Sequence, residues 1–243
     1  MACSRKPLIF DDSDGQELRI NTVNTYLKKK FGMKMVKLSI DGGFTCPNRD
    51  GTKGVGGCLF CSASGSGDTA AGSGDIISDL NSQITLLSDK WPSAGYIAYF
   101  QSHTNTYAPV TELREKFCAA LKHPSVKGIA IATRPDCLPD DVVDLLAELN
   151  EKTFTWVELG LQTIHAETAA KMNLCYTLDD YDLAVKKLIS RGIPVVTHLI
   201  LGLPGETREM MLDSVKHVCS RGIFGIKLHM FNLVKGSPME KLY

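Results

Sequence analysis

The chain has 243 residues, of which 44% are hydrophobic and 22% charged, a composition typical of a globular protein. Lysine plus arginine equals aspartate plus glutamate at 27 each, so net charge neither predicts nor excludes a polyanionic partner. No apolar run approaches the roughly 20 residues that cross a bilayer, and the N-terminus lacks the apolar segment of a signal peptide. We therefore expect no membrane association. Eight cysteines without an export signal predict reduced thiols and a cytoplasmic protein.

Residues 1–20 are polar and irregular and predict a flexible N-terminal arm, and residues 21–243 predict one core domain. A short helix capped by Asn21 is expected to begin this domain. Apolar strands then alternate with amphipathic helical segments. The predicted strands are 35–40, 96–100, 128–133, 155–161, 194–201 and 226–231. This alternation indicates an α/β fold with a parallel sheet, and six strands instead of eight predict a partial (β/α)6 barrel.

Polar side chains occur in or directly after each predicted strand. Gln101 follows the second strand, Arg134 follows the third, and Glu158 lies within the fourth. His198 lies in the fifth strand and His229 in the sixth. Because the carboxyl ends of parallel strands meet at one edge of a sheet, these residues predict a shared site there.

Three cysteines follow the first strand, in the stretch DGGFTCPNRDGTKGVGGCLFC. Cys46, Cys58 and Cys61 have the spacing C-x11-C-x2-C, with four glycines between the first two. Three thiolates are one fewer than the four that complete a structural zinc site or hold an ordinary four-iron cluster. The pattern therefore predicts a metal centre with one open position for a cofactor or substrate. A zinc site completed by a nearby histidine such as His103 is the alternative.

Several further sequence motifs accompany the cysteine pattern: FTCPNRDGT, YFQSHTNTYAP, TRPDCLP, ELGLQTIH and THLILGLPGET. With them the chain resembles the radical S-adenosylmethionine (radical SAM) superfamily. Within it, the chain is similar to a bacterial subfamily related to the Elongator catalytic subunit and to coproporphyrinogen dehydrogenase. The resemblance covers Asn21 to Tyr243 and includes the widened first gap of the cysteine motif. Two features depart from the family pattern. Residues 172–176 stand where relatives have an Arg-Gly-His motif. Relatives also continue past residue 243, so a C-terminal extension is expected to be missing, as in a natural truncation or a fragment.

The resemblance implies a [4Fe-4S] cluster held by Cys46, Cys58 and Cys61, with S-adenosylmethionine bound at the open iron. Reductive cleavage would give a 5'-deoxyadenosyl radical that abstracts hydrogen from a substrate. Such chemistry is oxygen-sensitive and needs an electron donor such as flavodoxin or ferredoxin. Thiolates suit iron–sulfur clusters, and glycines let the loop approach one closely.

The resemblance also implies cofactor contacts outside the cysteines. Phe60 would approach the adenine, and Gln101 would lie where the family binds the methionine amino group. Glu158 and Gln162 would contact the ribose, and backbone from Ile200 to Gly202 would face the adenine.

Related families act on transfer RNA bases or tetrapyrroles, so the resemblance favours tRNA modification. The alternative is a non-catalytic metal-binding module, with zinc or an iron–sulfur cluster, that docks on RNA or on a protein. An inert role is expected for Cys137 and Cys175, with a reactive thiol near the site as the alternative for either, and Cys175 as a methyl acceptor is a third hypothesis.

Overall fold

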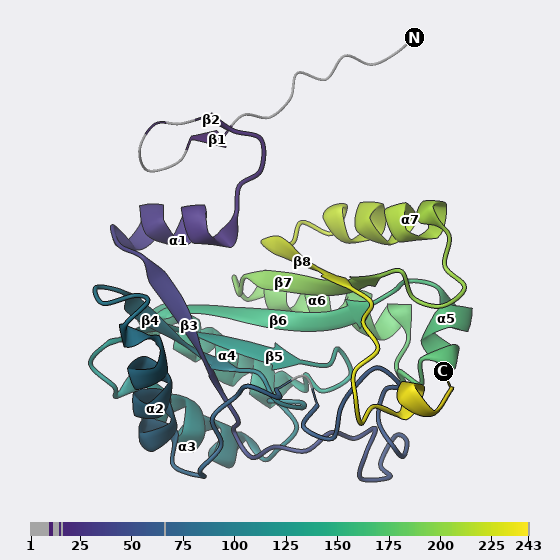
Figure 1. Cartoon of the computed structure of the whole chain (residues 1–243), viewed down its shortest axis with the longest axis horizontal. Coiled ribbons are helices and arrows are strands. Elements are labelled where there is room, and N and C mark those ends of the chain that lie inside the picture. Colours follow the sequence, from purple (N-terminus) through teal and green to yellow (C-terminus); the bar gives the residue numbers. More distant parts are fainter. Residues whose placement is uncertain (1–9, 12–14, 16, 66, 243) are drawn as a thin grey trace.

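The computed structural model describes residues 10–11, 15, 17–65 and 67–242. The predicted flexible arm, residues 1–20, falls largely outside these ranges. Its described part contains β1 (Phe10–Asp11) and β2 (Glu17–Leu18), which pair antiparallel. Helix α1 and the main sheet follow along the chain (Figure 1).

The core is a six-stranded parallel sheet whose spatial order equals the order along the chain (Figure 1). Its strands are β3 (Met35–Ile40), β4 (Gly95–Phe100), β5 (Val126–Thr133), β6 (Phe154–Gln162), β7 (Val195–Leu201) and β8 (Gly225–Met230). All six predicted strands are confirmed. Because each strand pairs with the next, the sheet curls as a partial (β/α)6 barrel with β3 and β8 as its two edges.

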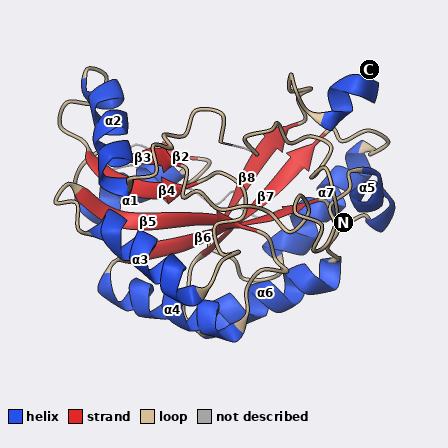
Figure 2. Cartoon of the chain, turned by 90° about the horizontal axis from the view of Figure 1, so that it is seen from below, coloured by secondary structure: helices blue, strands red, loops and turns tan. Residues whose placement is uncertain are grey.

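Helices connect successive strands on the outer side of the sheet (Figure 2). They are α2 (Ile76–Ser88), α3 (Val110–Leu121), α4 (Asp140–Lys152), α5 (Ala166–Lys171), α6 (Leu178–Ser190) and α7 (Arg208–Cys219). Local capping sets several of their starts: Asp75, Thr177 and Thr207 each accept a hydrogen bond from a backbone N–H of the first turn. The helix before the sheet is α1 (Val23–Phe31), and its N-cap is Thr22. The prediction of Asn21 as the cap was therefore wrong by one residue.

Two apolar clusters fill the two faces of the sheet. The larger lies between the sheet and its outer helices, and Phe100, Phe117 and Leu146 are fully buried in it. The smaller lies on the inner face near the strand starts, where Leu27 of α1 packs with the buried Trp156. Helix α1 therefore closes the N-terminal end of the half-barrel, and the inner face stays open toward the carboxyl ends of the strands.

The chain after β8 returns to the cysteine loop, defined here as residues 41–65. The 3₁₀-helix η1 (Pro238–Leu242) packs there, and the N–H of Met239 donates to the carbonyl of Leu59 at 3.0 Å. Met239 and Met172 join a third apolar cluster against Phe60. Among the described residues, no helix has the length and apolarity to cross a membrane.

Candidate functional site

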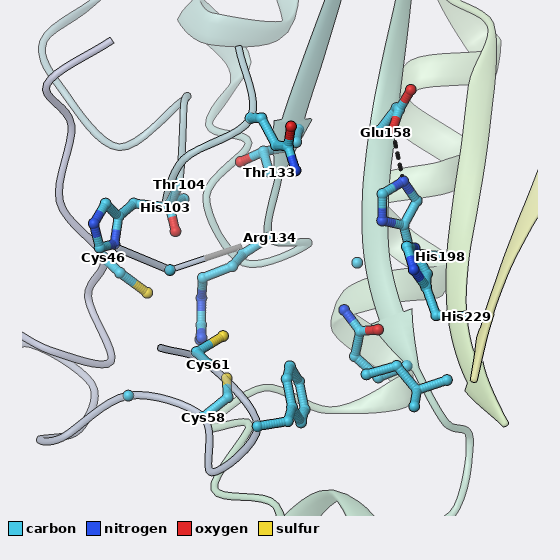
Figure 3. Close-up of a pocket in the computed structure, with 18 of the residues that line it drawn as sticks. Cys46, Cys58, Cys61, His103, Thr104, Thr133, Arg134, Glu158, His198 and His229 are labelled. Carbon is cyan, nitrogen blue, oxygen red and sulfur yellow. Dashed lines mark hydrogen bonds and ion pairs between the residues drawn. The ribbon is translucent and has the colours of Figure 1, made fainter. Parts of the chain in front are cut away.

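A cavity of about 410 Å³ lies on the inner face of the sheet, toward the carboxyl ends of the strands. Residues of β4 to β8 line it together with the cysteine loop that follows β3. Figure 3 shows Cys46, Cys58 and Cys61 on one side of this cavity and Glu158, His198 and His229 on the other. The prediction that polar strand ends share one site agrees with this arrangement.

The backbone of the cysteine loop folds tightly around its three cysteine side chains. The carbonyl of Cys46 accepts hydrogen bonds from the N–H groups of Arg49 and Asp50, at 2.8 and 3.2 Å. A turn links the other two cysteines, with the N–H of Cys61 donating to the carbonyl of Cys58 at 3.0 Å. These local bonds orient three side chains from a loop that has little regular secondary structure.

The segment Met172–Tyr176 supports the cysteine loop from outside. The N–H of Leu59 donates to the carbonyl of Met172 at 3.0 Å, and the Asn173 amide donates to the carbonyl of Gly57 at 2.8 Å. In return, the Asn48 amide donates to the Asn173 carbonyl and lies 3.6 Å from the Cys58 sulfur. The sequence did not indicate that this segment braces the cysteine loop.

Arg134 is the charged group that the protein places beside the cysteines. Its guanidinium donates to both carboxylate oxygens of Asp136, at 3.0 and 2.9 Å, and to the carbonyls of Leu174 and Cys175. It also lies over the Tyr176 ring, 4.8 Å from the centroid. A cation held in this way is only 7% exposed and cannot swing away from the site.

The protein favours thiolate character at one cysteine. A hydrogen bond from Cys61, followed by the positive charge of Arg134, lowers the pKa of Cys58 to about 7 against the effect of burial. The same hydrogen bond, together with burial, raises the pKa of Cys61. Thiolate is the form of cysteine that binds metals.

The residues present fit an iron–sulfur cluster that also binds a polar molecule in the cavity. Three soft sulfur donors face one cavity, as such a cluster requires. Among the described residues, seven buried side-chain polar atoms lack a hydrogen-bond partner, and five of them lie in the cysteine loop or just after β4. These five belong to Asn48, Ser102, His103, Thr104 and Asn105. Unpaired buried polar atoms are costly, and two of these residues, His103 and Thr104, line the cavity, where a bound group can pair with them.

The single-zinc alternative gains no geometric support. His103 lines the same cavity as the cysteines. Nevertheless, within the described part of the chain, no three His, Cys, Asp or Glu side chains are arranged to hold one metal ion.

Most residues expected to contact the cofactor line the cavity. Phe60, Gln101, Gln162 and Ile200 do so, and Gly202 is not among the lining residues of the described chain. The N–H of Gly202 is instead directed at the Met211 sulfur, 3.0 Å away.

The orientation of Gln162 depends on an irregularity at the end of β6. The pairing with β7 shifts register between Gly160 and Gln162, and Gln162 has a positive φ of 69°. A Cβ on Gly160 would lie 2.8 Å from the Gln162 amide nitrogen. Glycine at position 160 therefore allows the Gln162 side chain to fold back over the strand.

Glu158 lies deeper in the half-barrel than a rim residue and is 3% exposed. One carboxylate oxygen accepts from Lys37 at 2.6 Å and from the Trp156 indole at 3.1 Å. The other accepts from His198 at 2.8 Å and from Lys227 at 3.3 Å. These hydrogen bonds and positive charges lower the pKa of Glu158 against burial, so the carboxylate is ionised. Sequence reasoning missed Lys37, whose isolated charge within an apolar strand was the available sign.

Comparison with known proteins decides the family. The radical SAM superfamily matches residues 46–218, which includes all three cysteines of the loop. The chain belongs to the radical SAM superfamily. It is 52% identical to the uncharacterized protein YtqA of Bacillus subtilis over 93% of this chain and 71% of that protein. It is 40% identical to protein YhcC of Escherichia coli over 92% of this chain and 72% of that protein.

Two more distant relatives of this radical SAM chain act on transfer RNA, as their names state. One is the tRNA-2-methylthio-N(6)-dimethylallyladenosine synthase of Fusobacterium nucleatum, 29% identical over 44% of this chain and 25% of that protein. The other is the tRNA uridine(34) acetyltransferase of Methanocaldococcus jannaschii, 27% identical over 55% of this chain and 23% of that protein.

Solved radical SAM structures share the fold. Elp3 of Methanocaldococcus infernus aligns with a TM-score of 0.60 at 16% identity, covering 86% of this chain and 48% of that one. HemN of Escherichia coli aligns with a TM-score of 0.56 at 14% identity, covering 83% and 45%. SuiB of Streptococcus suis, solved bound to S-adenosylmethionine, has a TM-score of 0.56 at 15% identity and covers 88% and 45%. The chain is thus an enzyme of the radical SAM class, whose cofactors are a [4Fe-4S] cluster and S-adenosylmethionine.

Cys175 and Cys137 are not among the described residues that line the radical SAM cavity. Cys175 is exposed and lines a neighbouring cavity, which gives no support to a methyl-acceptor role at the cysteine site. Cys137 is buried, and burial with the nearby Asp136 carboxylate raises the pKa of its thiol to about 12. A thiol that stays protonated is a poor nucleophile, in keeping with the inert role expected.

Proposed function

We propose that this protein reductively cleaves S-adenosylmethionine in the cavity described above and that Cys46, Cys58 and Cys61 are its cluster ligands. When bound, the cluster and S-adenosylmethionine supply a 5'-deoxyadenosyl radical for hydrogen abstraction from a substrate. The observation that carries the proposal is the convergence of three thiols on a cavity lined by the strands of a half-barrel.

The other residues of the cavity bind and orient in this proposal. Phe60 offers an apolar ring beside the cysteines, and Gln101 and Gln162 offer amides from neighbouring parts of the rim. Arg134 supplies positive charge next to the thiolates, which stabilises an anionic centre. The apolar cluster around Trp156 excludes water from the strand-start end.

The cleavage proposal is tested by anaerobic reconstitution with iron and sulfide, followed by dithionite and S-adenosylmethionine. We expect 5'-deoxyadenosine from the wild type, and none from variants in which one of Cys46, Cys58 or Cys61 is replaced by alanine. Cys219→Ala, an exposed cysteine at the end of α7, is the matched control. Purified triple-alanine protein that still holds iron and sulfide would contradict the ligand assignment.

We further propose that the substrate is a transfer RNA base, that flavodoxin or ferredoxin is the reductant, and that the enzyme works in the cytoplasm. The two tRNA-modifying relatives support the substrate class. Of the basic side chains near the site, Arg49 lines the cavity and donates to the carbonyls of Ser62 and Ala63, whereas Lys53 is half exposed and lines two neighbouring cavities.

Deuterium transfer tests the tRNA substrate directly. The reconstituted enzyme is given tRNA from cells grown in heavy water, and mass spectrometry measures deuterium in the 5'-deoxyadenosine formed. We expect deuterium with intact labelled tRNA and none after nuclease digestion or with unlabelled tRNA. Label arriving only from a deuterated small-molecule extract would refute tRNA as the substrate while leaving the cleavage chemistry intact.

A non-catalytic module that binds metal and docks on RNA or protein is not favoured by membership of an enzyme superfamily. It predicts bound metal without any 5'-deoxyadenosine. The reconstitution assay above therefore separates the two functions.

A further inference from the structure

The side of the cavity opposite the cysteines is closed by a charged layer, defined as Lys37, Tyr99, Glu158, His198 and Lys227. Figure 3 shows two of its members, Glu158 and His198, across the cavity from the cysteines. The members of the layer come from five of the six strands of the sheet, β3, β4, β6, β7 and β8. The apolar cluster beneath it, with α1, closes the half-barrel. A substrate that enters from the mouth would meet this layer as the floor of the cavity.

Glu158 does not need Lys227 to satisfy its carboxylate. Three donors already reach it at 3.1 Å or less: Lys37, the Trp156 indole and His198. The contact with Lys227 is a fourth and the longest, at 3.3 Å. A carboxylate has about four acceptor sites, so the three shorter bonds leave Glu158 nearly saturated.

Lys227 keeps donor capacity that faces the cavity. An ammonium has three N–H donors, and the two hydrogen bonds that Lys227 makes within the described chain are long: 3.3 Å to Glu158 and 3.4 Å to the hydroxyl of Tyr99, whose ring centroid lies 5.4 Å away. Its side chain is 34% exposed and lines the cavity, whereas Lys37 is not among the described lining residues.

The charges of the layer do not balance. Two ammonium groups, Lys37 and Lys227, face one carboxylate, Glu158. Glu158 is also the one carboxylate among the described residues that line the cavity, and of the lining cations Arg134 is already paired with Asp136, which leaves Lys227 to share Glu158 with Lys37. Unpaired positive charge in a partly buried space is stabilised by an anion.

We propose that Lys227, with His229 beside it on β8, binds a small oxyanion of the substrate, a carboxylate or a phosphate group, and that Glu158 and Tyr99 hold its ammonium in position. His229 lines the cavity, and its ring centroid lies 5.1 Å from that of His198. Burial and the neighbouring positive charges lower the pKa of His229 to about 4, so at neutral pH it offers an uncharged N–H donor. The inference rests on the proposed function in taking this cavity as the reaction site.

The test is an anion titration of the reconstituted holoenzyme with S-adenosylmethionine bound. Sodium acetate and inorganic phosphate are the probes, each compared with sodium chloride at equal ionic strength. The chain has two tryptophans, so Trp91→Phe leaves Trp156 as the only one, and its indole donates to Glu158 within the charged layer. Trp156 emission and the probe-dependent rise in melting temperature are the two readouts.

We expect both readouts to saturate with at least one probe. Lys227→Met should weaken the binding of that probe to the protein by about tenfold or more, because one charge-assisted hydrogen bond is lost. Lys227→Arg should retain it, and Lys216→Met, an exposed lysine of α7 paired with Asp213, should match the wild type. Stronger acetate binding assigns a carboxylate, and stronger phosphate binding assigns a phosphate.

A response no larger than that to chloride, or an equal response in Lys227→Met, would overturn the inference. So would a response that S-adenosylmethionine abolishes, because the site would then belong to the cofactor. Formation of 5'-deoxyadenosine by the wild type is measured separately. The inference can thus fail while the cleavage proposal stands, and the reverse outcome is equally visible.

Discussion

At the residue scale, Arg134 joins the cysteine site to the rest of the domain. Its guanidinium pairs with the carboxylate of Asp136, which is 3% exposed, and holds two carbonyls of the segment that braces the cysteine loop. Removing it would leave Asp136 buried with Lys53 at 3.8 Å as its remaining ion-pair partner. A buried charge left without its close partner is strongly destabilising.

We therefore expect Arg134→Gln to lower the free energy of unfolding by about 3 kcal/mol. Urea denaturation of the cluster-free protein under reducing conditions measures it. Arg114→Gln is the control, because its ion pair with Glu148 lies on the surface and contributes little. Equal stability of the two variants would show that Asp136 finds another partner and that Arg134 is not a structural anchor.

At the scale of the elements, two strand glycines differ in how closely the sheet packs around them. A Cβ on Gly128 of β5 would lie 2.5 Å from the Phe154 carbonyl and 3.0 Å from the Ile97 side chain. A Cβ on Gly225 of β8 would meet only the Val196 side chain, at 3.6 Å. The central strand β5 is thus packed more tightly around Gly128 than the edge strand β8 is around Gly225.

Gly128→Ala should consequently cost about 1–3 kcal/mol of folding free energy, since a close backbone atom cannot move aside cheaply. Gly225→Ala should cost much less, because an ordinary contact replaces an open space. Chemical denaturation of both variants beside the wild type checks the difference. If Gly225→Ala proved the more damaging, the packing order of the two strands would be wrong.

At the scale of the whole molecule, the charged layer couples stability to pH. Burial, and then the positive charges of His198 and Lys227, lower the pKa of His229 from 6.5 to about 4, against the attraction of Glu158, and Lys37 adds to the lowering. Between these values the unfolded chain binds a proton at His229 that the folded chain does not. Protons therefore favour the unfolded state, and the free energy of unfolding should fall as pH drops from 6.5 toward 4.

Unfolding by urea at several pH values in this range, for the wild type and for His229→Gln, measures the effect. The variant lacks this titrating group, so its stability should fall less steeply over the same range. His198, whose pKa is lowered by burial against its hydrogen bond with Glu158, should leave part of the slope in place. Identical slopes for both proteins would exclude His229 as a contributor.

The sequence by itself determined the order of the elements and indicated the family to which the chain belongs. The six strands follow from the side-chain periodicity along the chain. The spacing of the three cysteines and the motif words likewise indicated the family that the comparisons show. These features depend on residues close together in the chain, which is why they can be predicted without the fold.

Only the tertiary structure decided which distant side chains meet. Glu158 is 121 residues from Lys37 and 69 from Lys227, and Asn48 is 125 from Asn173. Whether such pairs form depends on strand register and on which face of the sheet each residue occupies. A one-residue shift would exchange the two faces. The charged floor of the cavity and the bracing of the cysteine loop were therefore decided by the packing of the half-barrel, beyond the reach of local pattern.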